Sequence, residues 1–349
     1  MKNLLGSLKI WLLMLFFSVV LLTNGGCGGS DSRGSDSQLS PFAGGSGTQN
    51  DPYQISTAQQ LAKVNDFLDQ HFILTADIDL SSYENWTPIG THVPTQENFE
   101  VPDTDFAFTG TFDGKGHTIS NVKITLGEDS MGVGLFGCVI GNETEQSIKA
   151  LTPDNLAANA DTPLIKNLIV NNVDIKGGFL IGGVIGELYY GNIDNVRLTG
   201  NNRVVGSIYG SFGAIGGLVG MLYGVIENCT AQADVIAPGG PNEGMAGIIA
   251  GGTKHAAISN CSATGSVTAD GERAMSIGGL AGCLQDSPFI EDCTVNATIS
   301  ASGEKSFMVG GLLGHAGNYN STNPTLIKNC SANVNIIMAP IVKTTKRQN

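Results

Sequence analysis

Two carboxylates that are separated by a single residue are the first groups in this sequence that could do chemistry. Asp77 and Asp79 occur in the run ADIDL, and a strand would place both on one face because its side chains alternate. Carboxylates roughly 5 to 9.5 Å apart can hydrolyse glycosidic bonds, and their oxygens also bind calcium. Asp103 and Asp105 lie close by in an acidic insertion, residues 91–107. Any Asp-x-Asp on a strand has this spacing, so we interpret the pair as structural, with calcium binding and glycan chemistry as the alternatives.

Four of the seven cysteines recur at one position of a repeated pattern, and they are Cys229, Cys261, Cys293 and Cys330. If the repeats stack, these side chains form a ladder with a spacing of about 4.8 Å. Their parallel Cβ vectors would suit a disulfide poorly, and the sequence has no CxxC spacing for zinc. We therefore expect a passive ladder of buried thiols, with disulfides or a metal as the alternatives. Cys138 and Cys283 directly follow glycine-rich boxes and are expected in the core too.

The histidines offer no catalytic constellation. The five are His71, His92, His117, His255 and His315. None belongs to an HExxH motif, which zinc peptidases use to bind their metal. His117 lies where a turn meets a strand, so its role is expected to be structural. We predict no catalytic residue, no cofactor and no resident metal.

The composition favours strands and tight turns. Glycine accounts for 48 of 349 residues, 41% of residues are hydrophobic, and only 14% are charged. Abundant Gly, Asn, Ser, Thr, Val and Ile are typical of strands and turns. The net charge of −13 argues against a nucleic-acid partner, because that affinity depends on Lys and Arg at phosphates.

The first 26 residues read as a signal for export. Lys2 and Lys9 supply a positive start, and the apolar run that follows at 10–22 is too short to cross a bilayer of roughly 30 Å as a helix. The segment resembles a bacterial lipoprotein signal, which implies lipidation of Cys27 and attachment to a membrane. Ordinary cleavage and secretion are the alternative. Residues 27–45 are rich in Gly and Ser and are expected to be a flexible tether.

Two short boxes recur in phase along the chain, and such repeats decide the fold class. The first, Gly-Gly-apolar-apolar-Gly, starts at residues 182, 216, 278 and 310, with a degenerate copy at 246. The second, Ile-x-Asn-(Cys/Leu/Val), starts at 119, 165, 193, 226, 258 and 327, with Asp in place of Asn in the copy at 290. Each repeat therefore combines a glycine-rich strand, a turn and a second strand.

The residues after the second box alternate between apolar and polar. Cys229, Ala231, Ala233 and Val235 share one parity, and polar residues fill the other. This period of two is typical of a half-buried strand, and repeats of about 32 residues can bury such faces only by stacking. We therefore predict an all-β fold, a right-handed parallel β-helix. The recurrent Asn at the turn, including Asn195, Asn228, Asn260 and Asn329, would form an amide ladder.

A short helix is expected at the start of the stack. Ser56 or Thr57 can cap a helix from Ala58 to Asp69. Such a helix would cover the open edge of the first coil. The chain then divides into a signal (1–26), the tether (27–45), a cap with the first coils (46–125), the repeats (126–337) and a polar tail (338–349).

The two boxes resemble the GLUG repeat of bacterial exported and surface proteins, which also occurs beside IgA-cleaving metallopeptidases. The upstream run GSGTQNDPYQISTAQQLAKVND is similar to the leader of such proteins, so the resemblance covers about residues 45 to 337. It implies an exported, adhesin-like protein without the peptidase domain.

The function that follows is a surface-tethered binding or adhesion module without enzymatic activity. Its partner would be an extracellular glycan or a matrix or surface protein, bound through variable connections. These are residues 200–215, 236–245, 268–277 and 300–309, with the insertion 140–163 as a further candidate. A β-helix polysaccharide lyase or hydrolase and a purely structural envelope protein are the alternatives.

Overall fold

The computed structural model describes residues 40–93, 102–152, 164–206, 213–238, 244–270, 276–287, 289–302, 308–317 and 325–338. They belong to one compact unit that begins at Ser40. The predicted signal, its Cys27 and the tail beyond 338 lie outside the described residues. No described helix is long and apolar enough to cross a membrane.

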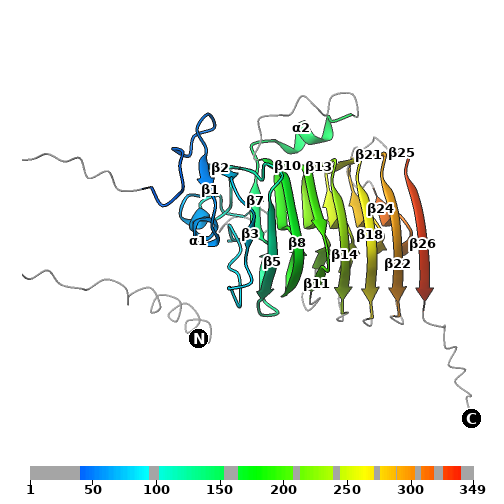
Figure 1. The fold of residues 1–349 in the computed structure, drawn as a ribbon. Coiled ribbons are helices and arrows are strands. Elements are labelled where there is room, and N and C mark those ends of the chain that lie inside the picture. The colour runs from blue at the N-terminus through cyan, green and yellow to red at the C-terminus, as the bar shows by residue number, and fades with distance from the viewer. Residues whose placement is uncertain are drawn as a thin grey trace, which may run out of the picture. The chain divides into compact units, whose positions relative to one another are not determined.

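The predicted all-β class is confirmed, and all pairings between the named strands are parallel (Figure 1). Strands from successive repeats lie side by side in register, so each repeat contributes one coil to a stack. A small sheet takes one strand from each glycine-rich segment. Its strands are β6 (Met131–Val133), β9 (Phe179–Gly182), β12 (Gly213–Gly216), β15 (Gly244–Gly247), β19 (Ser276–Gly278) and β23 (Met308–Gly310).

A large sheet holds the remaining strands and winds around the core. Its first part contains β1 (Tyr53–Ile55), β2 (His71–Leu74), β3 (Ile78–Asp79), β4 (Thr111–Asp113), β5 (Thr118–Thr125) and β8 (Leu164–Gly177). The strands that follow the glycine boxes are β7 (Phe136–Ile140), β10 (Ile185–Thr199), β13 (Val219–Glu227), β16 (Ala250–Lys254), β20 (Ala281–Gln285) and β24 (Leu313–Gly317). The second boxes give β17 (Ala257–Ser259), β21 (Phe289–Glu291) and β25 (Leu326–Lys328). The alternating segments give β11 (Arg203–Gly206), β14 (Thr230–Ala237), β18 (Ser262–Ala269), β22 (Thr294–Ala301) and β26 (Ser331–Met338).

The glycine boxes allow the chain to pass from one sheet to the other. β12 ends at Gly216 and β13 begins at Val219, so only two residues make the turn. A Cβ atom on Gly220 would lie 2.5 Å from the carbonyl oxygen of Gly186 in the preceding coil. No side chain fits at that distance, because real Cβ atoms do not approach so closely, and this explains why the box requires glycine.

The core forms because the inward parity of every coil is apolar. Val235, Val267 and Ile299 occupy one register position on β14, β18 and β22, and all three are fully buried. Each buried Val or Ile contributes about 1.5–3 kcal/mol relative to an exposed side chain. The same cluster runs from Phe42 to the last coil, so one continuous core holds the stack together.

The first coil is covered by a helix that is shorter than predicted. α1 spans Ala58–Ala62 and continues as a 3₁₀ turn, η1 (Lys63–Asp66), instead of reaching Asp69. Thr57 is its N-cap, since its hydroxyl accepts a hydrogen bond from the Gln60 N–H. Aromatic packing ends the helix early, because Phe67 turns to contact the rings of Phe42 and Tyr53.

The same ring cluster corrects the predicted tether. Phe42 is buried and stacks on Tyr53 with ring centroids 4.4 Å apart, and Gly44 pairs with Gln54. Residues 40–45 therefore belong to the fold, because one aromatic side chain in a Gly/Ser-rich segment supplies enough apolar surface to dock it.

The insertion 140–163 packs against the stack where it is described. α2 (Glu145–Lys149) begins at Thr144 in a capping box, and it lies beside the ends of β10 and β13 in Figure 1. Ile148 and Leu151 contact an outward-facing apolar cluster of the large sheet, whose members are Val225, Ala257 and Phe289. The buried His255 joins this segment to the sheet, with its Nε2 3.2 Å from Glu145 Oε1. The described part of the insertion thus covers a sheet face.

Candidate binding surface

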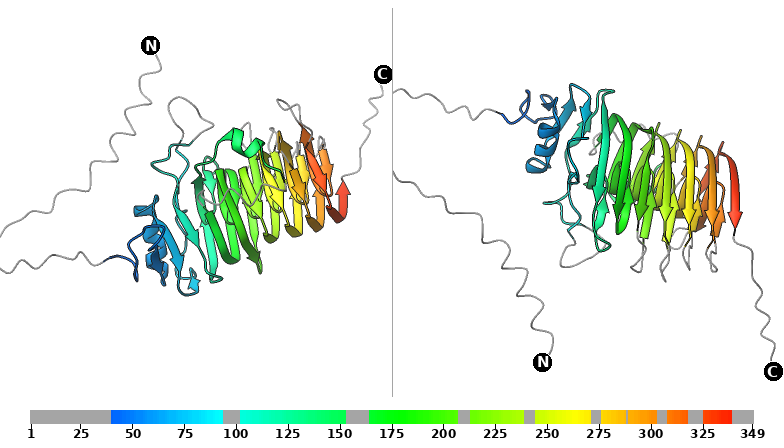
Figure 2. Two further views of the ribbon diagram at one scale, coloured as in Figure 1. Left: turned by 90° about the horizontal axis from the view of Figure 1, so that it is seen from above. Right: turned by 60° about the horizontal axis from the view of Figure 1, so that its bottom comes forward.

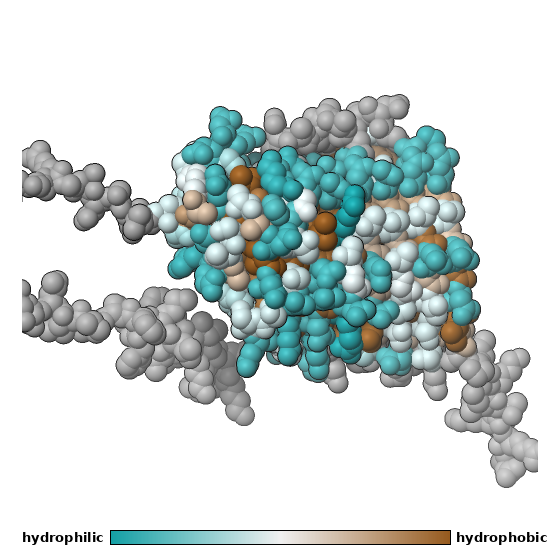
Figure 3. All heavy atoms as spheres, in the orientation of Figure 1, coloured by the Kyte–Doolittle hydropathy of each residue, from teal (hydrophilic) through white to brown (hydrophobic). Residues whose placement is uncertain are grey.

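A polar trough runs across the outer face of four neighbouring strands, β14, β18, β22 and β26. In Figure 3 this face is mainly white to teal, with brown at the edge near the last strand. Two adjacent hollows of about 340 Å³ and 300 Å³ form the trough, and both are lined by Gly265. The hollows therefore share one floor that crosses several coils.

The trough exists because the strands bend at one register position. Ala233, Gly265, Ala297 and Val334 align there, and the side chains of Ala233 and Ala297 are buried. Gly265 has φ of +127°, and a Cβ atom on it would lie 2.1 Å from the carbonyl oxygen of Ala233. This backbone conformation is open essentially to glycine alone. The bend turns the polar residues on either side into two walls.

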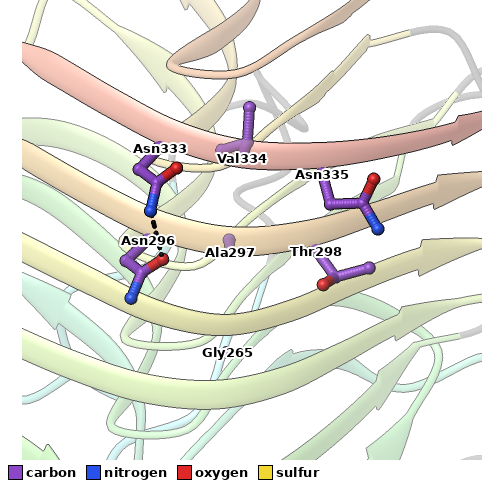
Figure 4. Close-up of a pocket in the computed structure, with 7 residues that line it drawn as sticks. All are labelled: Gly265, Asn296, Ala297, Thr298, Asn333, Val334 and Asn335. Atoms are coloured by element: carbon purple, nitrogen blue, oxygen red, sulfur yellow. Dashed lines mark hydrogen bonds between the residues drawn. The ribbon is translucent and has the colours of Figure 1, made fainter.

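Each wall is a row of amides and hydroxyls from successive coils, and the second row also holds one carboxylate, Asp234. The first row is Gln232, Thr264, Asn296 and Asn333, and the second is Asp234, Ser266, Thr298 and Asn335. Neighbours in a row are separated by the strand spacing of about 4.8 Å. Figure 4 shows Asn296 and Asn333 on one side of the floor and Thr298 and Asn335 on the other. The trough thus offers donors and acceptors at a regular repeat.

Hydrogen bonds within the rows fix the positions of these side chains. Asn333 Nδ2 donates to Asn296 Oδ1 at 3.2 Å, as the dashed line in Figure 4 shows. Ser266 Oγ donates to Asp234 Oδ1 at 2.6 Å. Because the coils hold the side chains in register, little ordering would remain for a ligand to impose.

A charged group closes the trough at its N-terminal end. Arg203 is paired in register with Asp234, and its guanidinium lies 3.6 Å from Asp174 Oδ1. Asn202 is buried beside it, where its side-chain amide donates to the carbonyl oxygen of Gln232 at 2.8 Å. This end carries both signs of charge, whereas the described trough is otherwise neutral apart from Asp234.

The structure places Asp77 and Asp79 on one exposed face of the chain, but protein donors occupy both. Asp77 Oδ1 accepts from the Thr118 N–H at 2.9 Å and lies 3.1 Å from His117 Nδ1. Asp79 accepts from the Asn121 amide at 2.8 Å and from Ser81. These hydrogen bonds lower the pKa of both carboxyls. The largest contribution comes from the Thr118 N–H in Asp77 and from the Asn121 amide in Asp79. The two side chains thus join adjacent coils by hydrogen bonds.

The described part of the acidic insertion, 91–93 and 102–107, does not join this pair into a metal site. Asp103 accepts a hydrogen bond from the N–H of Asp105, which caps a local turn. Across the described residues no group of three His, Cys, Asp or Glu side chains is arranged to hold a metal ion.

The four ladder cysteines are stacked as free thiols. Cys229, Cys261 and Cys293 are buried, whereas Cys330 on the last coil is partly exposed. Each sulfur donates to the carbonyl oxygen two residues earlier, for example Cys261 Sγ to Ser259 O at 3.1 Å. Burial raises the pKa of Cys261 well above its ordinary value, which keeps the thiol protonated.

The prediction that Cys283 lies in the core is wrong. Cys138 is buried, but under Ala107 in a small cluster outside the main core. Cys283 is partly exposed and packs in another outer cluster with Met221 and Met245. On β20 the residues that join the main core are Ala281 and Leu284, and Cys283 between them packs outside it.

The recurrent Asn residues occupy the corners of the coils in the left-handed region. Asn195, Asn228, Asn260 and Asn329 have φ between 50° and 53°. The amide of Asn260 donates to Asn228 Oδ1 at 2.6 Å, but that of Asn228 donates to Asp194 and that of Asn195 to Asn167. The ladder thus runs in short segments that carboxylates interrupt.

The predicted binding loops are described only in part. Residues 207–212, 239–243, 271–275 and 303–307 lie outside the described ranges, and the flanking residues lead into the small sheet (Figure 2). The trough was not predicted as a site. The sequence did show the polar residues that alternate after each second box. The bend at Gly265, which makes the strand face that carries them concave, depends on tertiary structure.

Comparison with known proteins identifies the repeat. The family model of the GLUG motif matches residues 213–236 and 306–337. Halomucin of Haloquadratum walsbyi is 33% identical over 175 residues, which cover 47% of this chain and 2% of that protein. A "Putative Gly-rich membrane protein" of Evansella cellulosilytica is 32% identical over 166 residues, covering 46% of this chain and 16% of that protein. The chain thus spans a small part of these relatives.

A solved structure supports the same architecture. The crystal structure of a putative immunoglobulin A1 protease from Bacteroides ovatus superposes with a TM-score of 0.57 at 20% identity, and covers 84% of this chain and 80% of the other. At this identity the likeness concerns the fold. The match to the GLUG family model confirms the expectation of GLUG repeats, and the chain carries this motif in two of its coils.

Proposed function

We propose that this protein is an exported, lipid-anchored surface module that binds an extended, neutral glycan along the trough. The stacked coils would wind as a right-handed parallel β-helix, the hand that parallel crossover connections nearly always take. The two in-register rows of amides and hydroxyls carry the proposal. A polymer with regularly spaced hydroxyls matches such rows better than a compact ligand does.

The charge of the protein favours a neutral chain over a polyanion. The net charge is −13, and the described trough holds Asp234 as well as Arg203. A glycan rich in carboxylates or sulfates would meet repulsion, whereas a neutral glycan needs only hydrogen bonds. Amides and hydroxyls donate and accept at once, as sugar hydroxyls do.

Surface display is supported by the leader and by the relatives. An apolar run at 10–22 followed by Cys27 is typical of lipoprotein export. The two relatives are named as a halomucin and a glycine-rich membrane protein. One acyl chain gives only reversible membrane binding, whereas more than one chain on Cys27 would anchor the protein stably.

Catalysis is not part of the proposal. A glycosidase needs one carboxyl that is protonated near neutral pH, and burial usually supplies it. Asp77 and Asp79 are exposed, their pKa values are lowered by hydrogen bonds, and their oxygens bind neighbouring coils. Both carboxylates would stay ionised, and their oxygens would stay hydrogen-bonded to protein donors.

The test is a glycan and matrix-protein array probed with the purified protein and with an Asn296→Ala/Asn333→Ala variant. We expect wild-type binding to neutral glycans and a loss of at least tenfold in the variant. Gln59→Ala, which removes an exposed amide on α1, is the matched control and should bind as wild type does. Binding to matrix proteins alone, no binding at all, or release of oligosaccharide from any glycan would contradict the proposal.

The anchor has its own test. Mass spectrometry of the protein from membranes should find lipid on Cys27, and Cys27→Ser should release the protein from the membrane fraction. An unmodified Cys27 in membrane-bound protein would reject lipid anchoring without affecting the glycan proposal.

A further inference from the structure

A row of sulfur-containing side chains lies outside the main core, along the seam where the two sheets meet. The large sheet contributes the register positions Met221, Gly252, Cys283 and His315. The small sheet contributes Ala214, Met245, Ser276 and Met308. Met221, Met245 and Ala214 form a buried cluster, and Leu180, Tyr223 and Cys283 pack against it. We call the set Met221, Met245 and Cys283 the sulfur seam.

The two methionine sulfurs of the seam lie beside one glycine. A Cβ atom on Gly252 would lie 3.0 Å from Met221 Sδ and 3.0 Å from Met245 Sδ. The two sulfurs are therefore no further apart than twice that distance. Cys283 follows Gly252 in register, about 4.8 Å along the stack. Both thioethers thus lie over Gly252, where the Met245 methyl is the nearest atom at 2.7 Å, and Cys283 packs against the same cluster.

We propose that the sulfur seam binds a soft monovalent cation, Cu(I), through the sulfurs of Met221, Met245 and Cys283. Thioether and thiolate ligands select Cu(I), whereas Ca²⁺ and Mg²⁺ require oxygen ligands. The surroundings here are apolar, with Ala214 and Leu180 in the same cluster. The site is reachable from solvent through Cys283, which is partly exposed.

Binding exchanges one proton for the metal ion. The Cys283 thiol loses its proton to solvent, and the thiolate then forms a bond to Cu(I), with no change in oxidation state. Because the thiolate is the form that binds, metal binding releases this proton. His315 lies in register one coil further and is the nearest nitrogen ligand in this row.

The experiment is an anaerobic competition for Cu(I), supplied as its acetonitrile complex, between the protein and a chromogenic chelator. We expect one tightly bound Cu(I) per chain and a loss of affinity of at least tenfold in Met245→Leu and in Cys283→Ala. Leucine matches the volume of methionine, so Met245→Leu should keep the fold. Circular dichroism checks this, and X-ray absorption at the copper edge should show sulfur neighbours.

Two control variants separate the sulfur seam from other sulfurs. Met131→Leu changes an exposed methionine on β6, and Cys330→Ala changes the partly exposed end of the cysteine ladder. Both should bind Cu(I) as wild type does. The proposal is overturned if Met245→Leu retains wild-type affinity, if Cys330→Ala abolishes binding, or if the wild-type protein binds no Cu(I). The seam lies apart from the trough, so these outcomes do not depend on glycan binding.

Discussion

The side-chain amide of Asn260 donates a hydrogen bond of 2.6 Å to Oδ1 of Asn228 in the preceding coil, and both residues sit in the left-handed backbone region, with φ of 50° and 53°. Asparagine tolerates this conformation better than other residues with a Cβ, and its amide can also bridge two coils. The recurrent Asn thus turns the chain and joins successive repeats with one side chain.

Replacing Asn260 separates these two contributions. Asn260→Ala removes the amide and forces a left-handed alanine, so we expect a loss of about 2–3 kcal/mol in the free energy of unfolding. Asn260→Gly loses the same hydrogen bond but adopts the conformation freely, so its loss should be about 1 kcal/mol smaller. Denaturant unfolding measures both. Equal losses would show that the backbone conformation contributes nothing.

The bend at Gly265 makes a second prediction. In Gly265→Ala the new methyl would clash with the Ala233 carbonyl, so we expect a destabilisation of at least 3 kcal/mol and a weakened trough. Gly127→Ala is the matched control, because a Cβ there meets nothing within 4 Å and its φ is not positive. Thermal unfolding of the two variants should differ clearly. Similar melting temperatures would contradict the bend.

The reactivity of Cys283 should report its burial. With a pKa of about 11, the thiolate is scarce at pH 8, and the rate of iodoacetamide labelling should rise about tenfold per pH unit up to pH 10. In urea-unfolded protein the same thiol should level off near pH 9, since an ordinary cysteine titrates at about 8.5. Peptide mass spectrometry follows the label. A plateau at pH 9 in the folded protein would place Cys283 in open solvent.

Asp113 should make the fold sensitive to acid. Its partial burial would raise the pKa, but hydrogen bonds from the Lys115 N–H and the Asn167 amide outweigh this and hold it below the ordinary 3.8. A lowered pKa means that the unfolded state binds the proton more readily, so the stabilisation is present above pH 3.8 and lost below it. The stability gap between wild type and Asp113→Asn should therefore narrow as the pH falls from 5 towards 3. A constant gap across urea unfolding curves at these pH values would refute the assignment.

The sequence was sufficient where a pattern repeats. The boxes at 216 and 226 predicted strands, turns and their stacking, because every coil solves the same packing problem. The alternation from Cys229 to Val235 also predicted which side chains are buried. The same local rules apply to every coil, so one irregular copy does not change the predicted fold.

Features that depend on one residue in one place were missed. Phe42 gave no periodic signal, yet its stacking on Tyr53 orders the end of the predicted tether. Cys283 follows a glycine box as Cys138 does, but its exposure depends on what covers each coil from outside. The concave trough needs the bend at Gly265, and no local rule predicts the direction in which a sheet bends.

The most direct test of the trough is the dependence of affinity on glycan length. Four coils at about 4.8 Å give rows about 14 Å long, so titration calorimetry with neutral oligosaccharides of increasing length should show affinity rising until the chain spans the rows and then levelling off. An affinity that is independent of length, or no binding at any length, would contradict an extended site built across stacked coils.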